Sequence, residues 1–166
     1  FTWSVSVTQQ SIQPIDTDLP ALLRSIVSKY PNHTAIRFEG KDTSFHKFAA
    51  LTDRVAAGLY ANGIRKGNHV GLYCPNSEAF AVAYFGIIKA GATVVPINLL
   101  FKPSEIEYIL RDADAVGLVY HELFADSVHA FRDQLSGLKT FIRIGTAQPE
   151  TGDLAWADIA SSTAPV

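Results

Sequence analysis

The chain has 166 residues, of which 48% are hydrophobic and 18% charged, a composition that excludes a disordered tail or a fibrous repeat. Its 14 Lys and Arg residues against 16 Asp and Glu residues give a net charge of −2. That balance argues against a nucleic-acid-binding or membrane-surface protein, because a phosphate-binding face shows as a basic excess. No apolar run approaches the length of a membrane span. The single cysteine, Cys74, cannot form an internal disulfide, so we expect a cytoplasmic location.

The first part of the chain predicts an arm, a helix, a β-hairpin and a second helix, over residues 1–17, 18–30, 34–45 and 46–62. The sequence of the arm shows no regular spacing of hydrophobic residues. Asp18 is placed to cap the first helix, whose apolar residues follow the 3.6-residue spacing. Two short strands flank the turn Glu39-Gly40-Lys41-Asp42 and predict the hairpin. Gly63 follows the second helix, where a left-handed C-cap is expected.

From about residue 69 onward, apolar strands alternate with helices, and the strands are predicted at residues 69–74, 92–97, 115–120 and 140–144. The first intervening helix, 78–90, is apolar nearly all round and predicts a helix covered on several sides, with Gly91 ending it in a left-handed conformation. The next starts at Pro103 with a Ser104/Glu107 capping box. The third runs from about Phe124 to Leu135.

Continuous apolar strands separated by helices are typical of a parallel sheet covered on both faces. The sequence therefore predicts an α/β fold, a three-layer sandwich with a mostly parallel sheet and a small N-terminal β-hairpin. Residues 18–145 would form this α/β subdomain. Residues 146–166 are turn-rich apart from a short stretch around Trp156 and Ile159, and predict a linker.

Familiar catalytic motifs are absent from the sequence: there is no Walker loop, no dinucleotide fingerprint and no nucleophile elbow. His121-Glu122 begins like a zinc-protease helix, but Ala125 occupies the position of the second histidine. The five histidines are scattered, so no metal site is predicted. Nothing basic flanks Cys74 in the sequence, which favours a buried, inert thiol over a nucleophile.

Two loops are expected at the carboxyl ends of neighbouring strands, where open α/β sheets bind ligands. These loops follow Cys74 and Ile97 and contain Asn76, Ser77 and Asn98, the only polar candidates for a binding edge. The alternative is that these residues serve the architecture alone, as Gly86 would serve close helix packing and Gly91 a reversal of the chain.

Four segments in order resemble adenylate-forming enzymes. Residues 43–48 resemble their "TYxEL" segment, and residues 66–72 resemble their "KGDxVAL" strand. Residues 75–98 match "PNSxEF…FGxxKAGAxxVPIN" almost throughout, and "EIxYIL" follows at residues 105–110. The run from about 19 to 144 is therefore similar to the N-terminal portion of an AMP-forming acyl-CoA synthetase, most like the long-chain fatty-acid CoA ligases. Phe45 and Lys47 replace the usual Tyr and Glu, and Asn68 replaces Asp.

This resemblance implies a two-step ligase that uses ATP, Mg²⁺ and CoA to convert a small carboxylic acid into its acyl-CoA through an acyl-adenylate. In the family, the phosphate-binding "TSGTTGxPKG" loop and the catalytic lysine lie downstream of the matched segments. We therefore expect an inactive N-terminal fragment, to which no catalytic residue of the family can be assigned. Its partners would be the rest of its own chain, a second N-terminal subdomain and a C-terminal domain.

Loss of these partners is expected to leave apolar surface exposed on the helix at 78–90 and at Leu99-Leu100-Phe101, so the isolated chain is predicted to self-associate. A related alternative is an amino-acid-adenylating enzyme, although "VPIN" and "EIxYIL" favour the CoA ligases. An aryl-acid or carnitine-type CoA ligase is a further alternative. A different class is a free-standing flavodoxin-like binding module without enzymatic activity. A reading frame that continues into a Ser/Thr/Gly-rich loop would favour the ligase.

Overall fold

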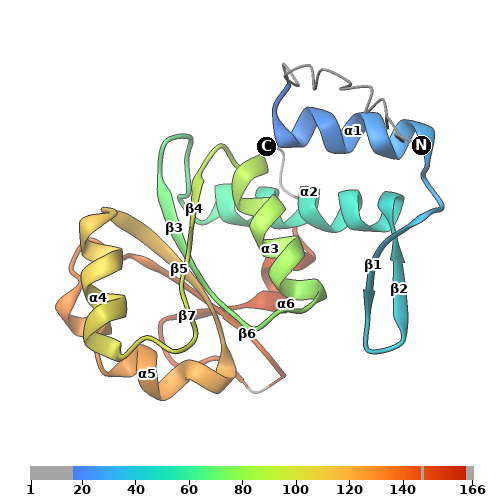
Figure 1. The fold of residues 1–166 in the computed structure, drawn as a ribbon. Coiled ribbons are helices and arrows are strands. Elements are labelled where there is room, and N and C mark those ends of the chain that lie inside the picture. The colour runs from blue at the N-terminus through green and yellow to red at the C-terminus, as the bar shows by residue number, and fades with distance from the viewer. Residues whose placement is uncertain (1–16, 147, 164–166) are drawn as a thin grey trace, which may run out of the picture.

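A computed structural model describes residues 17–146 and 148–163. Its main sheet is five-stranded and parallel, in the order β4-β3-β5-β6-β7 (Figure 1). The strands of this sheet are β3 (His69–Tyr73), β4 (Thr93–Pro96), β5 (Ala115–His121), β6 (Thr140–Ile144) and β7 (Asp153–Ala155). A separate antiparallel hairpin pairs β1 (Thr34–Phe38) with β2 (Lys41–Ser44). The predicted α/β class, parallel sheet and hairpin are confirmed. The predicted arm, 1–17, lies outside the described residues apart from Thr17.

Helices cover both faces of the main sheet (Figure 1). One face carries α2 (Phe45–Ala61), α3 (Glu78–Lys89) and α6 (Trp156–Ala160), and α1 (Leu19–Lys29) packs outside them on α2 and α3. The other face carries α4 (Pro103–Asp112) and α5 (Ala125–His129), with the 3₁₀ turns η1 (Glu122–Phe124) and η2 (Arg132–Gln134). These layers make the three-layer sandwich that the sequence predicted.

The central strands are fully buried because successive side chains enter different cores. Val119 belongs to the cluster beneath α2 and α3, whereas its neighbours Leu118 and Tyr120 belong to the cluster beneath α4 and α5. All three side chains are inaccessible to solvent. Alternation of side chains between the two faces of a strand therefore places apolar residues in both layers, and explains why β5 reads as a continuous apolar run.

The hairpin turn is shorter than predicted. Glu39 and Gly40 both have positive φ, 48° and 74°, which is the conformation of a two-residue type I′ turn. Lys41 and Asp42 therefore belong to β2 rather than to the turn. The Arg37 Nε atom donates to Asp42 Oδ1 across the strands at 2.7 Å. Phe45, predicted in the second strand, instead begins α2.

The predicted Ser104/Glu107 capping box of the helix that starts at Pro103 is wrong. Lys102 is the N-cap of α4, and its backbone N–H donates to Glu105 Oε2 at 2.7 Å. The helix begins with Pro103 at its first position, so Glu105 rather than Glu107 occupies the third position, from which a carboxylate can reach back to the cap.

The predicted helix from Phe124 to Leu135 is broken into η1, α5 and η2. The Phe131 N–H donates to Val128 O at 3.2 Å, and the Gln134 N–H to Phe131 O at 2.9 Å, both in the 3₁₀ pattern. Val128, Phe131 and Leu135 are nevertheless buried. The apolar spacing thus identified the buried side chains correctly, but it is equally compatible with tighter turns.

The segment predicted as a linker, 146–166, contains regular structure within its described residues, 148–163. In this segment β7 pairs in parallel with β6, and α6 follows directly. The predicted boundary at residue 145 therefore does not coincide with the end of the sheet. A strand of three residues is too short to show an alternating pattern in the sequence.

The expected exposure of apolar residues is found at one of the two predicted places. Leu99, Leu100 and Phe101 are exposed, and Leu100 retains 88% of its accessible surface. In contrast, no residue of α3 is exposed, although several are only half-buried. Phe85 of α3 packs edge-to-face on Phe48 of α2, with ring centroids 5.1 Å apart. The helix α3 is covered by α1 and α2 more fully than its composition suggested.

Gly91 should be sensitive to substitution. It follows α3 with φ of +80°, and a Cβ atom at this position would lie 3.0 Å from Lys66 Cβ. The variant Gly91→Val should lower the free energy of unfolding by about 1–3 kcal/mol, because a β-branched residue is strained at positive φ. Urea denaturation measures this change. The control Gly137→Val, at a site with no atom within 4 Å of the added Cβ, should change stability much less. An unchanged midpoint for Gly91→Val would contradict the prediction.

Candidate functional site

The three candidate binding residues lie at one edge of the sheet. The strands β3 and β4 pair in parallel, with Leu72 opposite Pro96, so their carboxyl ends are adjacent. Asn76 and Ser77 follow β3, and Asn98 follows β4. The structure therefore brings the two predicted loops together at the edge where open α/β sheets bind ligands.

Two of these three side chains have structural roles at this edge. The Ser77 Oγ atom accepts a hydrogen bond of 3.0 Å from the Phe80 N–H and caps α3. The Asn98 Oδ1 atom accepts a hydrogen bond of 3.0 Å from the Leu100 N–H and closes a turn after β4. Asn76 is exposed to solvent. The interpretation that these residues serve the architecture thus applies to Ser77 and Asn98, although Asn98, like Asn76, is exposed to solvent.

Cys74 is buried at the end of β3, as expected from its neighbours. Its Sγ atom lies 3.4 Å from Pro75 O and 3.8 Å from Ser77 Oγ. Burial raises the pKa of the thiol, and the hydrogen bond to Ser77 opposes this only in part. The protonated thiol is a poor nucleophile, so the site favours an inert cysteine.

The first turn of α3 is tied to the hairpin and to α2. The Thr43 hydroxyl donates to the Glu78 carboxylate, and Lys47 Nζ lies 3.7 Å from Glu78 Oε1. Glu78 stands at the first position of α3, where a negative charge also interacts favourably with the helix dipole. The Glu78 carboxylate, which directly follows Ser77 in the chain, therefore helps to hold the hairpin against α3.

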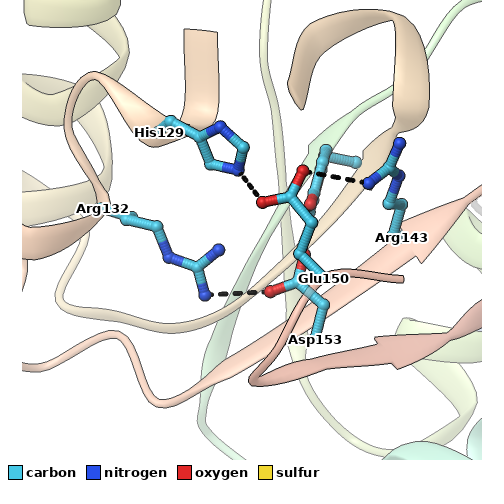
Figure 2. A network of polar contacts seen from close by, with 6 residues as sticks. His129, Arg132, Arg143, Glu150 and Asp153 are labelled. Atoms are coloured by element: carbon cyan, nitrogen blue, oxygen red, sulfur yellow. Dashed lines mark hydrogen bonds and ion pairs between the residues drawn. The ribbon is translucent and has the colours of Figure 1, made fainter. Parts of the chain in front are cut away.

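A second polar cluster, which we call the latch, was not predicted from the sequence. It joins two carboxylates of the last segment to four side chains from the sheet and from the α5 layer (Figure 2), and consists of Tyr120, His129, Arg132, Arg143, Glu150 and Asp153. Glu150 forms its outer half. One carboxylate oxygen lies 2.5 Å from His129 Nε2, and the other accepts from Arg143 at 3.2 Å.

Asp153 forms the inner half of the latch, and its side chain is inaccessible to solvent. It accepts a hydrogen bond of 2.9 Å from Arg132 and a second from the Tyr120 hydroxyl. Arg132 also stacks over the Phe141 ring, 4.3 Å from the ring centroid. Burial, together with the hydrogen bond to Asp153, raises the pKa of Tyr120 well above its usual range. Tyr120 therefore stays protonated and remains a donor to the carboxylate.

Sequence reasoning missed the latch because its members are far apart in the chain: Tyr120 and Asp153 are separated by 33 positions, and Arg132 and Asp153 by 21. One signal was present. Arg143 interrupts the apolar strand β6, and a charge within a buried strand requires a partner. The sequence gives no indication that this partner is Glu150.

Neither a metal-binding cluster nor a membrane-spanning helix is found in the described part of the chain, 17–146 and 148–163. No three side chains among its histidines, cysteines and acidic residues come together in a way that could hold a metal ion. None of its helices is long and apolar enough to cross a membrane.

The capping role of Ser77 can be tested directly. The variant Ser77→Ala should lower the free energy of unfolding by about 1 kcal/mol, because the Phe80 N–H loses its acceptor. Asn76→Ala, at the neighbouring exposed position, serves as the matched control and should change stability by less than about 0.5 kcal/mol. Thermal or urea unfolding measures both variants. Equal effects at the two positions would contradict a specific capping role.

Comparison with known proteins places this geometry in a family. A family model described as AMP-binding enzyme matches residues 23–164. The chain is 35% identical over 105 residues to a long-chain-fatty-acid–CoA ligase of Bacillus subtilis, an alignment that covers 63% of this chain and 19% of that protein. It is 29% identical over 121 residues to a medium/long-chain-fatty-acid–CoA/3-oxocholest-4-en-26-oate–CoA ligase of Mycobacterium marinum, covering 73% of this chain and 22% of that protein.

A solved structure agrees with these relatives. An anthranilate CoA ligase in complex with anthranoyl-AMP superposes with a TM-score of 0.83 and 32% identity, over 89% of this chain and 28% of that one. The chain thus spans about a fifth of the length of the two curated relatives. The fold, the order of the matched segments and the family model agree, and the chain belongs to the AMP-binding enzyme family.

Proposed function

We propose that this chain is the N-terminal α/β subdomain of an AMP-forming acyl-CoA synthetase whose substrate is a fatty acid. The parent protein would join the acid to CoA at the expense of ATP, releasing AMP and pyrophosphate through an acyl-adenylate. The collinear match of residues 23–164 carries this proposal, because it includes every element from α2 to α6. The similarity to the ligases of Bacillus subtilis and Mycobacterium marinum, both named for fatty acids, supports this substrate class.

The described residues do not by themselves fit Mg·ATP. A nucleotide site needs several free donors around the phosphates and oxygen ligands for the metal. At the carboxyl edge, the candidate side chains Asn76, Ser77 and Asn98 are all neutral, and the oxygens of Ser77 and Asn98 already accept backbone hydrogen bonds. The groups that bind ATP, Mg²⁺ and CoA are therefore expected in parts of the parent protein outside this chain. Within the parent, this subdomain would support those parts.

A second candidate substrate class is an aromatic acid. The anthranilate CoA ligase is 32% identical to this chain, close to the identity of the fatty-acid ligases. A further alternative is an amino-acid-adenylating parent, and the test below distinguishes it from the other two. We also propose a cytoplasmic location for the parent, on the basis of the single buried cysteine.

The test of the proposed function is acid-dependent ATP–pyrophosphate exchange by the full-length protein encoded with this sequence. Long-chain and medium-chain fatty acids should stimulate exchange, and CoA should then yield the thioester. Stimulation by benzoate or anthranilate alone would favour an aromatic acid as the substrate. Stimulation by an amino acid would favour an amino-acid-adenylating parent. A full-length protein with no acid-dependent exchange would overturn the ligase proposal and favour a free-standing binding module.

The isolated chain should bind neither Mg·ATP nor CoA with micromolar affinity, because its described residues form no phosphate cradle and its net charge is −2. Isothermal titration calorimetry measures this, with the full-length protein as the positive control. A dissociation constant in the micromolar range for the isolated chain would contradict the prediction. Loss of that binding in Asn76→Ala would then locate the site at the carboxyl edge.

The isolated chain is also expected to self-associate through Leu99, Leu100 and Phe101, which would contact other parts of the parent protein. Light scattering and hydrophobic-dye fluorescence across a concentration series measure this. Leu100→Ser should reduce both signals. Leu123→Ser is the matched control, since Leu123 is 73% exposed in the 3₁₀ turn η1, away from this segment. A monomer that binds no dye at high concentration would contradict the prediction.

A further inference from the structure

The last described segment, residues 150–160, crosses the edge of the main sheet, and we call it the strap (Figure 1). At its start, Glu150 and Asp153 contact side chains from the face that carries α5. At its end, Trp156 and Ile159 pack into the core on the face that carries α2. The strap therefore joins the two outer layers of the sandwich around the β6 edge of the sheet.

The backbone of the strap contributes little stability of its own. The strand β7 has three residues and pairs with β6 alone, so it is an edge strand. The helix α6 has five residues, and no side chain caps its N-terminus at Ala155. Helices of this length are unstable in isolation, because nucleation costs more than so few hydrogen bonds return. The strap must therefore be held by its side-chain contacts at the two ends.

The polar end of the strap is held by the latch. Every partner of its two carboxylates lies outside the strap, on β5, β6, α5 or η2 (Figure 2). Asp153 is the central member, because its carboxylate is inaccessible to solvent and accepts from both Arg132 and Tyr120. The pairs of Glu150 are partly exposed and contribute less, since solvent screens them. Loss of the Asp153 charge would also leave Arg132 without its carboxylate partner.

The apolar end of the strap is held by a close approach to α2. A Cβ atom on Gly58 would lie 2.7 Å from Ile159 O, so α6 rests directly on the backbone of α2. Ile159 is buried there. The packing beside it is incomplete, because a cavity of about 80 Å³ remains between Trp156, Ala160 and the α2–α3 surface. At this end of the strap Ile159 is fully buried, whereas Leu154, Trp156 and Ala160 pack against the same core and are only partly buried.

We propose that the strap is a detachable unit that opens while the remaining four strands of the sheet stay folded, and that Asp153 in the latch keeps it closed. A short segment that is held by few side-chain contacts can open locally. The free energy of such local opening is lower than the free energy of global unfolding. Opening would expose the backbone of β6 and the surface of α2 around Gly58. This inference concerns the conformation of the chain and does not depend on the proposed substrate or reaction.

Native-state hydrogen exchange of this chain tests the proposal. In the wild type, the amides of β7 and α6 should exchange together, and faster than those of Leu72 and Val119 in the central strands. Asp153→Asn should accelerate exchange in the strap by about tenfold, the effect of losing one charge-assisted hydrogen bond, and leave the central strands unchanged. The matched control is Asp158→Asn, an exposed carboxylate in the first turn of α6, which should change exchange in the strap much less than Asp153→Asn and leave the central strands unchanged.

Two results would overturn the proposal. In the first, the wild-type amides of β7 and α6 exchange at the rate of the central strands, so that the strap opens only with the whole domain. In the second, Asp153→Asn accelerates all amides equally. The wild-type measurement decides the first point even if the variant fails to fold.

Discussion

The five-stranded sheet must be covered on both of its faces, because successive residues of each strand point to opposite sides and both sets are apolar. Val119 and Tyr120 are neighbours in β5, yet each is fully buried in a different core. The helices α2 and α3 on one side and α4 and α5 on the other are required by this single constraint. The strap adds the edge strand β7 to this sheet, and Trp156 and Ile159 after it pack into the core on the side of α2 and α3.

The sequence predicted the parts of the fold that repeat a pattern over many residues. The strands β3 to β6 and the helices α1 to α4 were found because their apolar spacing extends over four residues or more, and Gly91 because few residues other than glycine adopt its φ. Short elements were misjudged. The strand β7 has too few residues to show a period, and the spacing of Val128 and Phe131 suits a 3₁₀ turn as well as an α-helix.

The candidate site was predicted in position but only partly in role. Strand order placed Asn76, Ser77 and Asn98 at one edge, and a serine before a helix is a common N-cap, yet the sequence could not reveal that the Leu100 amide engages Asn98. Polar side chains near loops and helix ends often serve the local backbone, and this use is not distinguished from ligand binding by residue type. The latch posed the opposite difficulty, because its pairs depend on tertiary structure alone.

The β1–β2 hairpin stands apart from the main sheet, and among the described residues each of its strands pairs only with the other. Strands with an unpaired edge can recruit strands from other molecules. Arg37 and Asp42 form an ion pair on this hairpin, and both side chains remain largely hydrated. A foreign strand that added to this edge would have to remove water from two charges. The exposed charges of this pair thus disfavour edge-to-edge pairing of the hairpin with other chains.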